Sequence, residues 1–203
     1  MENELLRKSA KYLTGIINCH INKKGIELRK MEIGMETVII NVSKFILVYL
    51  LAAIFNVLPQ TFIVHLSFFL VKLFSFGLHA LNSTVCTLIS CCLFVLIPFA
   101  LSGMGIGNYS VAVVFAAVIF VLYRYAPADT KARPIIGATK RKKLKKKAIA
   151  CGLFLMAVAL LLPDNGMKLL LTLGAVYQSV FILPITYKIL KRSGKNYENF
   201  ERA

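Results

Sequence analysis

The sequence predicts an all-α fold: a polytopic membrane helix bundle of about six transmembrane or re-entrant helices, with an N-terminal amphipathic interfacial helix. Of the 203 residues, 58% are hydrophobic, compared with roughly 45–50% in ordinary soluble domains. The mean hydropathy is +0.70. The formal net charge is nevertheless +16, from 25 Lys and Arg against 9 Asp and Glu. Basic and apolar residues must therefore occupy separate segments, as they do when membrane helices are joined by polar loops.

The first segment, residues 1–36, is polar and charged, and its apolar residues recur at helical spacing. This pattern is typical of an amphipathic helix that lies in the membrane interface, and the sequence Asn22-Lys23-Lys24-Gly25 is expected to end it. A helix packed against the protein's own spans would have the same pattern, so both interpretations stay open. The apolar positions are Leu5, Leu6, Tyr12, Leu13, Ile16, Ile17 and Ile21.

Six apolar stretches follow, and a helix needs about 20 residues to cross about 30 Å of hydrocarbon. The second stretch contains His65 and Lys72, and the fifth is short, so either is expected to be tilted, re-entrant or part of a hairpin. The stretches are 37–58, 61–78, 84–102, 109–125, 148–162 and 167–189. We treat residues 1–203 as one membrane-embedded domain, with an amphipathic segment (1–36), four spans (37–125), a basic cytoplasmic loop (126–147), two spans (148–190) and a tail (191–203).

The basic residues predict the orientation of these spans. Residues 1–36, residues 124–147 and the tail from Lys188 hold seven, ten and five Lys or Arg, which is 22 of the 25. With an even number of spans, these three segments fall on one side of the membrane, which the positive-inside rule identifies as the cytoplasm. Lys168 is the exception. Both termini, and the connection between the second and third spans, are therefore expected at the cytoplasmic face of the cell membrane.

That connection contains the residues best suited to chemistry, His79 and Cys86. On one unbroken helix they would share a face but lie ~10 Å apart along the axis, too far for proton transfer. Residues 82–84 are all of N-cap type, so a new helix is expected to begin near Ser83, with Cys86 in a first turn that favours its thiolate. Such a pair could supply a nucleophile and a base, although packing alone also explains it. We expect a dyad, or a third member that is an amide or a backbone carbonyl.

Two motifs surround these residues. The stretch Phe76-Gly77-Leu78-His79-Ala80, followed by Cys86, resembles the G-G-x-H-A…C signature of the accessory gene regulator B (AgrB) peptidases of Gram-positive quorum sensing. Residues 125–135, Y-A-P-A-D-T-K-A-R-P-I, are similar to that family's Y-A-P-x-D-T-x-x-R-P-I element. The resemblance covers nearly the whole chain. It is interrupted at Phe76, where the family has its first Gly, and at Leu78, where it usually has Tyr.

The resemblance implies a membrane cysteine endopeptidase that cuts a precursor peptide of the AgrD type on the C-terminal side of its future signal segment. The acyl-enzyme then passes to a thiol or hydroxyl of the peptide, giving a cyclic thiolactone or lactone. In this resemblance Cys86 is the nucleophile and His79 the general base. Lys72 stands where the family commonly has Arg, and Gly77 matches its second Gly. A site at the membrane edge restricts water, which favours ring closure over hydrolysis.

A dense basic run precedes the fifth apolar stretch. Seven of the eight residues 140–147 are Lys or Arg, and Leu144 is the exception. Two interpretations stay open: an anchor on anionic lipid and, by the resemblance, a grip on the acidic C-terminal tail of the precursor, which salt would weaken. The candidate residues are Lys140, Arg141, Lys142, Lys143, Lys145, Lys146 and Lys147.

The main alternative function is a non-enzymatic transporter or helper subunit for peptide export. Such a protein needs ionisable groups along a path through the spans, and few besides His65 and Lys72 occur there. Five cysteines without C-x-x-C spacing predict neither a disulfide framework nor a metal site, and no cofactor is expected. The expected partners are the precursor peptide and anionic lipid. A homodimer is compatible with the resemblance, whereas nucleic acid is not expected.

Overall fold

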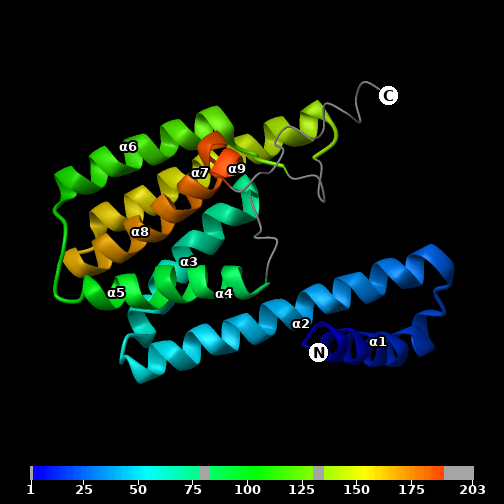
Figure 1. The fold of residues 1–203 in the computed structure, drawn as a ribbon. Helices are drawn as coiled ribbons and strands as arrows, with labels where there is room; N and C mark the ends of the chain where they lie inside the picture. The colour runs from blue at the N-terminus through cyan, green and yellow to red at the C-terminus, as the bar shows by residue number, and fades with distance from the viewer. Residues whose placement is uncertain (1, 78–82, 130–134, 190–203) are drawn as a thin grey trace. The chain divides into compact units, whose positions relative to one another are not determined.

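The computed structural model of the chain describes residues 2–77, 83–129 and 135–189, and of residues 2–7 and 83 it describes the backbone alone. Helices dominate this part of the chain (Figure 1), which confirms the predicted all-α fold. The helices are α1 (Glu2–Ile21), α2 (Gly25–Ile54), α3 (Leu58–Ser75), α4 (Ser83–Cys91), the π-helical turn η1 (Cys92–Leu96), α5 (Ile97–Ala100), α6 (Asn108–Tyr125), α7 (Ala138–Leu161), α8 (Asn165–Phe181) and α9 (Pro184–Ile189).

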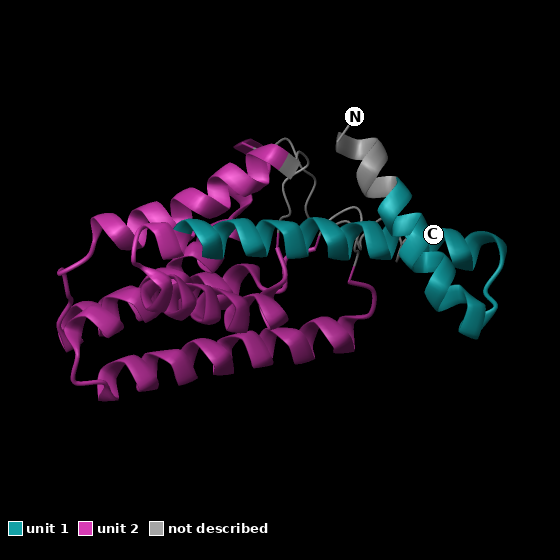
Figure 2. Cartoon of the chain, turned by 90° about the horizontal axis from the view of Figure 1, so that it is seen from below, with its two compact units in different colours: residues 1–51 teal, residues 52–203 magenta. Residues whose placement is uncertain are grey.

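The chain divides into two compact units, residues 1–51 and 52–203 (Figure 2). In the first unit, α1 ends at Ile21, and Asn18 closes the turn that follows. The Asn18 side chain accepts a hydrogen bond from the Lys23 N–H at 2.8 Å and donates one to the Lys23 carbonyl at 3.1 Å. These bonds satisfy backbone groups that a helix end leaves free, and the predicted end of the N-terminal helix is confirmed.

Helix α2 is longer than the first apolar stretch predicts. It begins at Gly25 rather than near residue 37, because residues 25–36 contain no Pro and their charges pair along the helix. Arg29 Nη1, for example, lies 2.9 Å from Glu32 Oε2. Among the described helices, α2, α3 and α6 are long and apolar enough to cross a membrane, which fits the predicted all-α membrane helix bundle; the predicted number of six spans stays a prediction.

The second unit is built on four helices, α3, α6, α7 and α8, which pack against one another around an apolar core (Figure 1). The third apolar stretch forms α4, η1 and α5, and η1 and α5 contact α3. Residues of all four bundle helices meet in the core, among them Val71, Phe115, Val118, Leu122, Leu155 and Ala175.

Helix α3 has two distinct faces. Polar side chains on its inner face tie it to its neighbours: Thr61 Oγ1 donates to the Phe94 carbonyl and Ser67 Oγ to the Leu171 carbonyl, both at 2.6 Å. Small and polar residues of this kind hold helices together in lipid, where apolar burial alone supplies little attraction. The outer face is apolar, as a lipid-facing surface is. Buried positions include Thr61, Val64, Phe68, Val71 and Ser75, and exposed ones Phe62, Leu66, Phe69 and Leu73.

Two elements differ from the sequence-based expectation. The basic run, expected in a loop, forms the first turns of α7, which begins at Ala138. Lys and Arg are good helix formers and no Gly or Pro lies among them, so the apolar helix extends back through the run. The sixth apolar stretch is interrupted: α8 ends at Phe181 and α9 begins at Pro184, because a proline cannot continue the helix before it.

Candidate active site

Two segments that the sequence singles out, 75–77 and 125–129, meet at one end of the second unit, which we call the motif end. The Gly77 N–H donates to the Ala128 carbonyl at 2.9 Å, and the Ala128 N–H donates to the Ser75 carbonyl at 2.9 Å. These bonds form an isolated parallel bridge. The two motifs, far apart in the sequence, are thus bonded backbone to backbone.

The backbone at Phe76 adopts a conformation that usually requires glycine. Its φ is 58° and its ψ is −130°, close to the first central residue of a type II′ turn, where a bulky side chain is strained. Gly77 follows with φ 110°, and a Cβ there would lie 3.1 Å from Ile182 Cγ2. The structure therefore keeps a glycine-like turn at the position where the G-G motif is interrupted.

Gln178 on α8 supports this turn. Its side chain is fully buried, and Nε2 donates to the Phe76 carbonyl at 2.6 Å and to Ser75 Oγ at 2.7 Å. Ser75 Oγ in turn donates to the Val71 carbonyl at 2.9 Å. Sequence reasoning missed Gln178; the available signal was an uncharged polar residue of hydrogen-bonding type inside an apolar stretch.

Cys86 lies in the first turn of α4, which begins at Ser83 as predicted. It is a half-buried free thiol, and its carbonyl accepts a hydrogen bond from Ser90 Oγ at 2.8 Å. The Lys72 side chain interacts electrostatically with Cys86, and Lys72 Nζ lies 4.9 Å from the centroid of the Phe68 ring.

His79, the expected base, lies outside the described residues. It follows Gly77 by two positions in the chain, so the turn at Phe76 and Gly77 is the point from which the chain reaches it.

A cavity of about 570 Å³ opens at the motif end. Its walls come from residues 124–129, the start of α7 and the segment around α9, which gather on the same side of the bundle in Figure 1. Several basic residues and one acidic residue, the buried Asp129, line the cavity. The basic residues of the cavity are Arg124, Arg141, Lys142, Lys145 and Lys188. Such a wall attracts acidic groups.

Tyr187 closes one side of this cavity, beyond the end of α8. Its hydroxyl donates to the Asp129 carbonyl at 3.0 Å. Burial, and after it the nearby Asp129 carboxylate, raises the pKa of Tyr187 to about 12. The phenol is therefore neutral at physiological pH and holds the end of the described 125–129 segment in place as a hydrogen-bond donor.

The basic run is divided between helix faces because it lies on α7. Arg141 Nη1 donates to the Ile135 carbonyl at 3.1 Å, and Lys145 Nζ lies 4.4 Å from the centroid of the Tyr123 ring. Three residues of the run line the cavity and four do not. The first set is Arg141, Lys142 and Lys145; the second is Lys140, Lys143, Lys146 and Lys147, of which Lys147 Nζ lies 5.7 Å from the Phe74 ring centroid.

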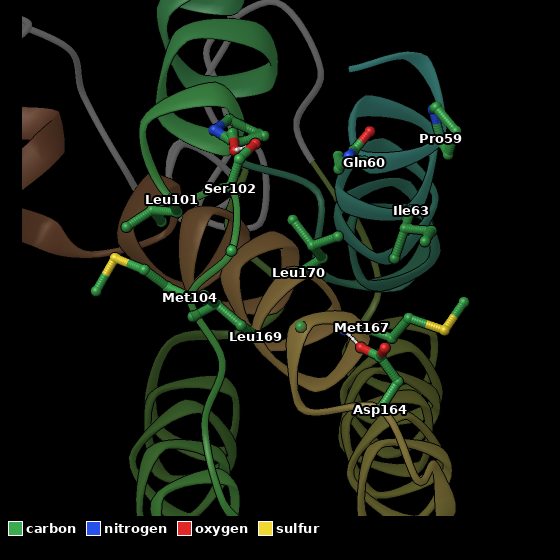
Figure 3. A pocket seen from close by; sticks show the side chains of 13 residues that line it. Pro59, Gln60, Ile63, Leu101, Ser102, Met104, Asp164, Met167, Leu169 and Leu170 are labelled. Carbon is green, nitrogen blue, oxygen red and sulfur yellow. Dashed lines mark hydrogen bonds between the residues drawn. The ribbon is translucent and has the colours of Figure 1, made fainter. Parts of the chain in front are cut away.

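A second cavity, of about 260 Å³, lies at the opposite end of the same bundle (Figure 3). Apolar side chains such as Ile63, Met104 and Leu170 dominate its wall. Its acidic residue, Asp164, is the N-cap of α8, with Oδ1 accepting from the Met167 N–H at 2.6 Å. The sequence predicts no chemistry here, and the carboxylate is occupied by its capping role.

For the remaining candidate residues, His65 and the other cysteines, the structure indicates packing or reveals no role. The His65 ring stacks on Phe94, with centroids 4.5 Å apart, as expected for a packed histidine. All five cysteines are free. Among the residues that the structure describes, no three His, Cys, Asp or Glu side chains group as metal ligands would.

The chain is similar to known proteins over most of its length. The family model described as accessory gene regulator B matches residues 10–182. A putative AgrB-like protein of Clostridium acetobutylicum is 40% identical over 202 residues, which cover 100% of this chain and 97% of that protein. A putative AgrB-like protein of Listeria innocua is 44% identical over 172 residues, or 85% and 84% of the two chains. The accessory gene regulator protein B of Staphylococcus intermedius is 34% identical over 164 residues, or 81% and 86%. No solved structure matches.

Proposed function

The chain belongs to the accessory gene regulator B family, and on this premise we propose that it is a membrane cysteine endopeptidase. It cleaves a quorum-sensing precursor peptide of the AgrD type and promotes cyclisation of the product through an acyl-enzyme thioester. Cys86 is the nucleophile and His79 the general base. The observation that carries the proposal is the bonding of the two motifs to each other, which joins Gly77 to Ala128, a residue of the cationic cavity.

The reaction proceeds in two acyl transfers. His79 takes the proton of the Cys86 thiol, and Cys86 Sγ attacks the scissile carbonyl. Collapse of the tetrahedral intermediate expels the C-terminal part of the precursor, whose amine takes that proton from the His79 imidazolium. The thioester formed is then attacked by a thiol or hydroxyl of the peptide itself. His79 accepts the proton of that group, Cys86 leaves as a thiolate, and the peptide closes into a thiolactone or lactone.

Lys72 and Gly77 support this chemistry in different ways. Lys72 interacts electrostatically with Cys86 and stabilises the thiolate both before attack and as it leaves. Gly77 admits a turn that no other residue fits without strain or displacement of Ile182. The start of α4 at Ser83 puts Cys86 in the first turn of a helix, at the positive end of the helix dipole, which favours an anionic sulfur.

The cationic cavity is the proposed site for the acidic tail of the precursor. Its lining by Arg141, Lys142 and Lys145 gives three charges that face a bound peptide, while the other basic residues of the run meet anionic lipid. The active site and both termini lie on the cytoplasmic side. Lys168, the exception to the charge pattern, is buried and donates to Asn165 Oδ1 at 3.1 Å, so it is not a free loop charge.

The experiment that tests the proposal is reconstitution of the chain in vesicles with the precursor, followed by mass analysis of the peptide and of the protein. Cys86→Ala and His79→Ala should each abolish cleavage, and the wild type should accumulate a covalent acyl adduct on Cys86. Cys91→Ala is the matched control, since it removes a thiol from the same helix and should cleave normally. Substantial cleavage by Cys86→Ala, or export of uncleaved precursor by it, would contradict the peptidase and favour a transporter.

A further inference from the structure

One buried polar group at the motif end, the side-chain amide of Gln178, has no role in the catalytic steps proposed above. This residue lies on α8, and its side chain reaches the end of α3 to bond both Ser75 Oγ and the Phe76 carbonyl. Both bonds are made by Nε2. Gln178 Oε1 is also buried, and within the described part of the chain it has no hydrogen-bond partner.

Because Oε1 is buried without a partner among the described residues, packing alone does not explain why this position holds a glutamine and not an apolar residue. A buried acceptor without a partner destabilises the fold, whereas an apolar side chain of the same length and shape would carry no such cost. Gln178 is fully buried among apolar helices, where that cost is largest. The N–H groups of Nε2 must therefore provide something that an apolar residue cannot.

What Nε2 contacts is the strained part of the backbone. Phe76 has a positive φ of 58°, a conformation that a residue with a side chain keeps only when its surroundings impose it. The bridge to Ala128 holds Ser75 and Gly77 on either side. The Phe76 carbonyl itself is held by Gln178, at 2.6 Å. Losing that bond would let the peptide unit after Phe76 rotate towards an ordinary conformation.

We propose that Gln178 is a positioning residue of the peptidase: its amide holds the Phe76–Gly77 turn in its glycine-like conformation and so fixes the start of the chain that carries the general base. This inference rests on the proposed function, because it assigns Gln178 a task in that reaction. Gln178 does not touch the reacting atoms and acts through the turn alone.

The test is cleavage of the precursor by Gln178→Met in vesicles. Methionine keeps the length of the side chain and removes the donor, so the turn relaxes and the base is displaced. Because a displacement of about 1 Å can cost roughly 100-fold in rate, kcat should fall by about 10-fold to 100-fold, with KM changed less than about twofold. If kcat stays within twofold of wild type, the inference is wrong.

Ser67→Ala is the matched control. Ser67 Oγ bonds the Leu171 carbonyl and joins the same two helices, α3 and α8, but it lies two turns, ~12 Å, before Ser75 on α3. It should lower thermal stability about as much as Gln178→Met while leaving kcat close to wild type. An equal fall of kcat in both variants would assign Gln178 a merely structural role.

Rescue provides a second measurement. Glycine adopts a positive φ without strain, so Phe76→Gly should need the clamp less. Added to Gln178→Met, it should raise kcat about 5-fold or more above that of Gln178→Met alone, even though it also deletes a large side chain. No gain in the double variant would overturn the turn-clamping role. If Gln178→Met does not accumulate in the membrane, Gln178→Leu, which also lacks the N–H donor, makes the same comparison.

The two proposals fail in different ways. If wild type and Cys86→Ala behave alike, the peptidase itself is wrong. If wild type cleaves, Cys86→Ala does not, and Gln178→Met cleaves like wild type, the peptidase stands and only the role of Gln178 is wrong.

Discussion

The two ends of the bundle in the second unit satisfy their helix termini with different hydrogen bonds. Each end must satisfy the backbone groups that several helix termini leave free. At the opposite end the Asp164 cap and the Lys168–Asn165 bond join residues within one turn of each other, and one backbone bond joins distant segments, from the Ile106 N–H to the Asn165 carbonyl at 3.1 Å. At the motif end the bonds join α3 to the segment after α6 and to Gln178 of α8.

Bonds between distant segments fix those segments relative to each other, and both ends contain them. Each end also has a buried glutamine oxygen without a partner among the described residues, Gln60 Oε1 at the opposite end and Gln178 Oε1 at the motif end. The motif end differs in its strained turn at Phe76 and in a cavity of about 570 Å³ with basic walls. Strain collects at functional sites because the surrounding structure can impose a geometry useful for chemistry.

The strongest test of this difference between the two ends is a Gly→Ala substitution at a glycine with positive φ at each end. Gly77→Ala strains a φ of 110° and brings a Cβ to 3.1 Å from Ile182 Cγ2. We expect precursor cleavage to fall by about 100-fold or more, since the turn that leads to the base is displaced. The measurement is the rate of peptide product formation in vesicles.

Gly103→Ala is its control at the opposite end. Gly103 has φ 82° and open space around a Cβ, so the variant is strained by the backbone alone. It should lose about 1 kcal/mol of stability and keep its cleavage rate. Equal loss of cleavage in both variants would remove the functional distinction between the two ends.

The next effect concerns the cationic cavity. Neutralising its three basic-run residues, Arg141→Gln, Lys142→Gln and Lys145→Gln together, should raise KM for an acidic precursor by about 10-fold, at roughly 0.5 kcal/mol for each partly screened charge pair. The effect should shrink as salt rises. Kinetics at low and high ionic strength measure it.

A second triple variant carries the same change in net charge on the same helix. Lys140→Gln, Lys143→Gln and Lys146→Gln lie outside the cavity wall, so KM should change less than about twofold, while attachment to anionic vesicles weakens. If the two triples raise KM equally, the run acts by total charge, and the cavity is not the binding site.

At the opposite end, Asp164→Ala should affect stability alone. It removes the acceptor for the Met167 N–H, and loss of an N-cap of this kind costs about 1 kcal/mol. Thermal unfolding in detergent should reveal the loss, with cleavage by the folded protein unchanged. A cleavage defect larger than the loss of folded protein would show that this end takes part in the reaction.

The smallest effect is one of pH. The pKa of Tyr187, raised to about 12, lies above the ordinary tyrosine value of about 10. Folding therefore favours the neutral phenol: the stabilisation is full below pH 10 and is lost as pH rises through the folded pKa. Tyrosinate absorbance should contain a late-titrating component that Tyr187→Phe lacks; an unchanged titration in that variant would contradict the assignment.

The sequence predicted the parts of this protein that depend on local or repeated patterns. Apolar stretches placed the helices, and the N-cap residues before Cys86 placed the start of α4. The helical basic run on α7 was missed because charge was interpreted as loop, whereas an apolar helix can extend through good helix formers. The clamp by Gln178 could not be predicted, because it depends on a residue about 100 positions after the turn that it bonds.

The backbone bridge between Phe76 and Ala128 also bears on how such proteins exchange parts during evolution or engineering. The bridge joins main-chain atoms and tolerates different side chains, whereas Gly77 leaves room only for Ile182, and the Phe76 carbonyl is bonded by Gln178. A chimera that takes residues 75–77 from one relative and residues 178–182 from another therefore combines side chains selected in separate proteins. These two stretches form one module despite their separation along the chain. Grafts that move the module whole should retain processing more often than grafts that divide it.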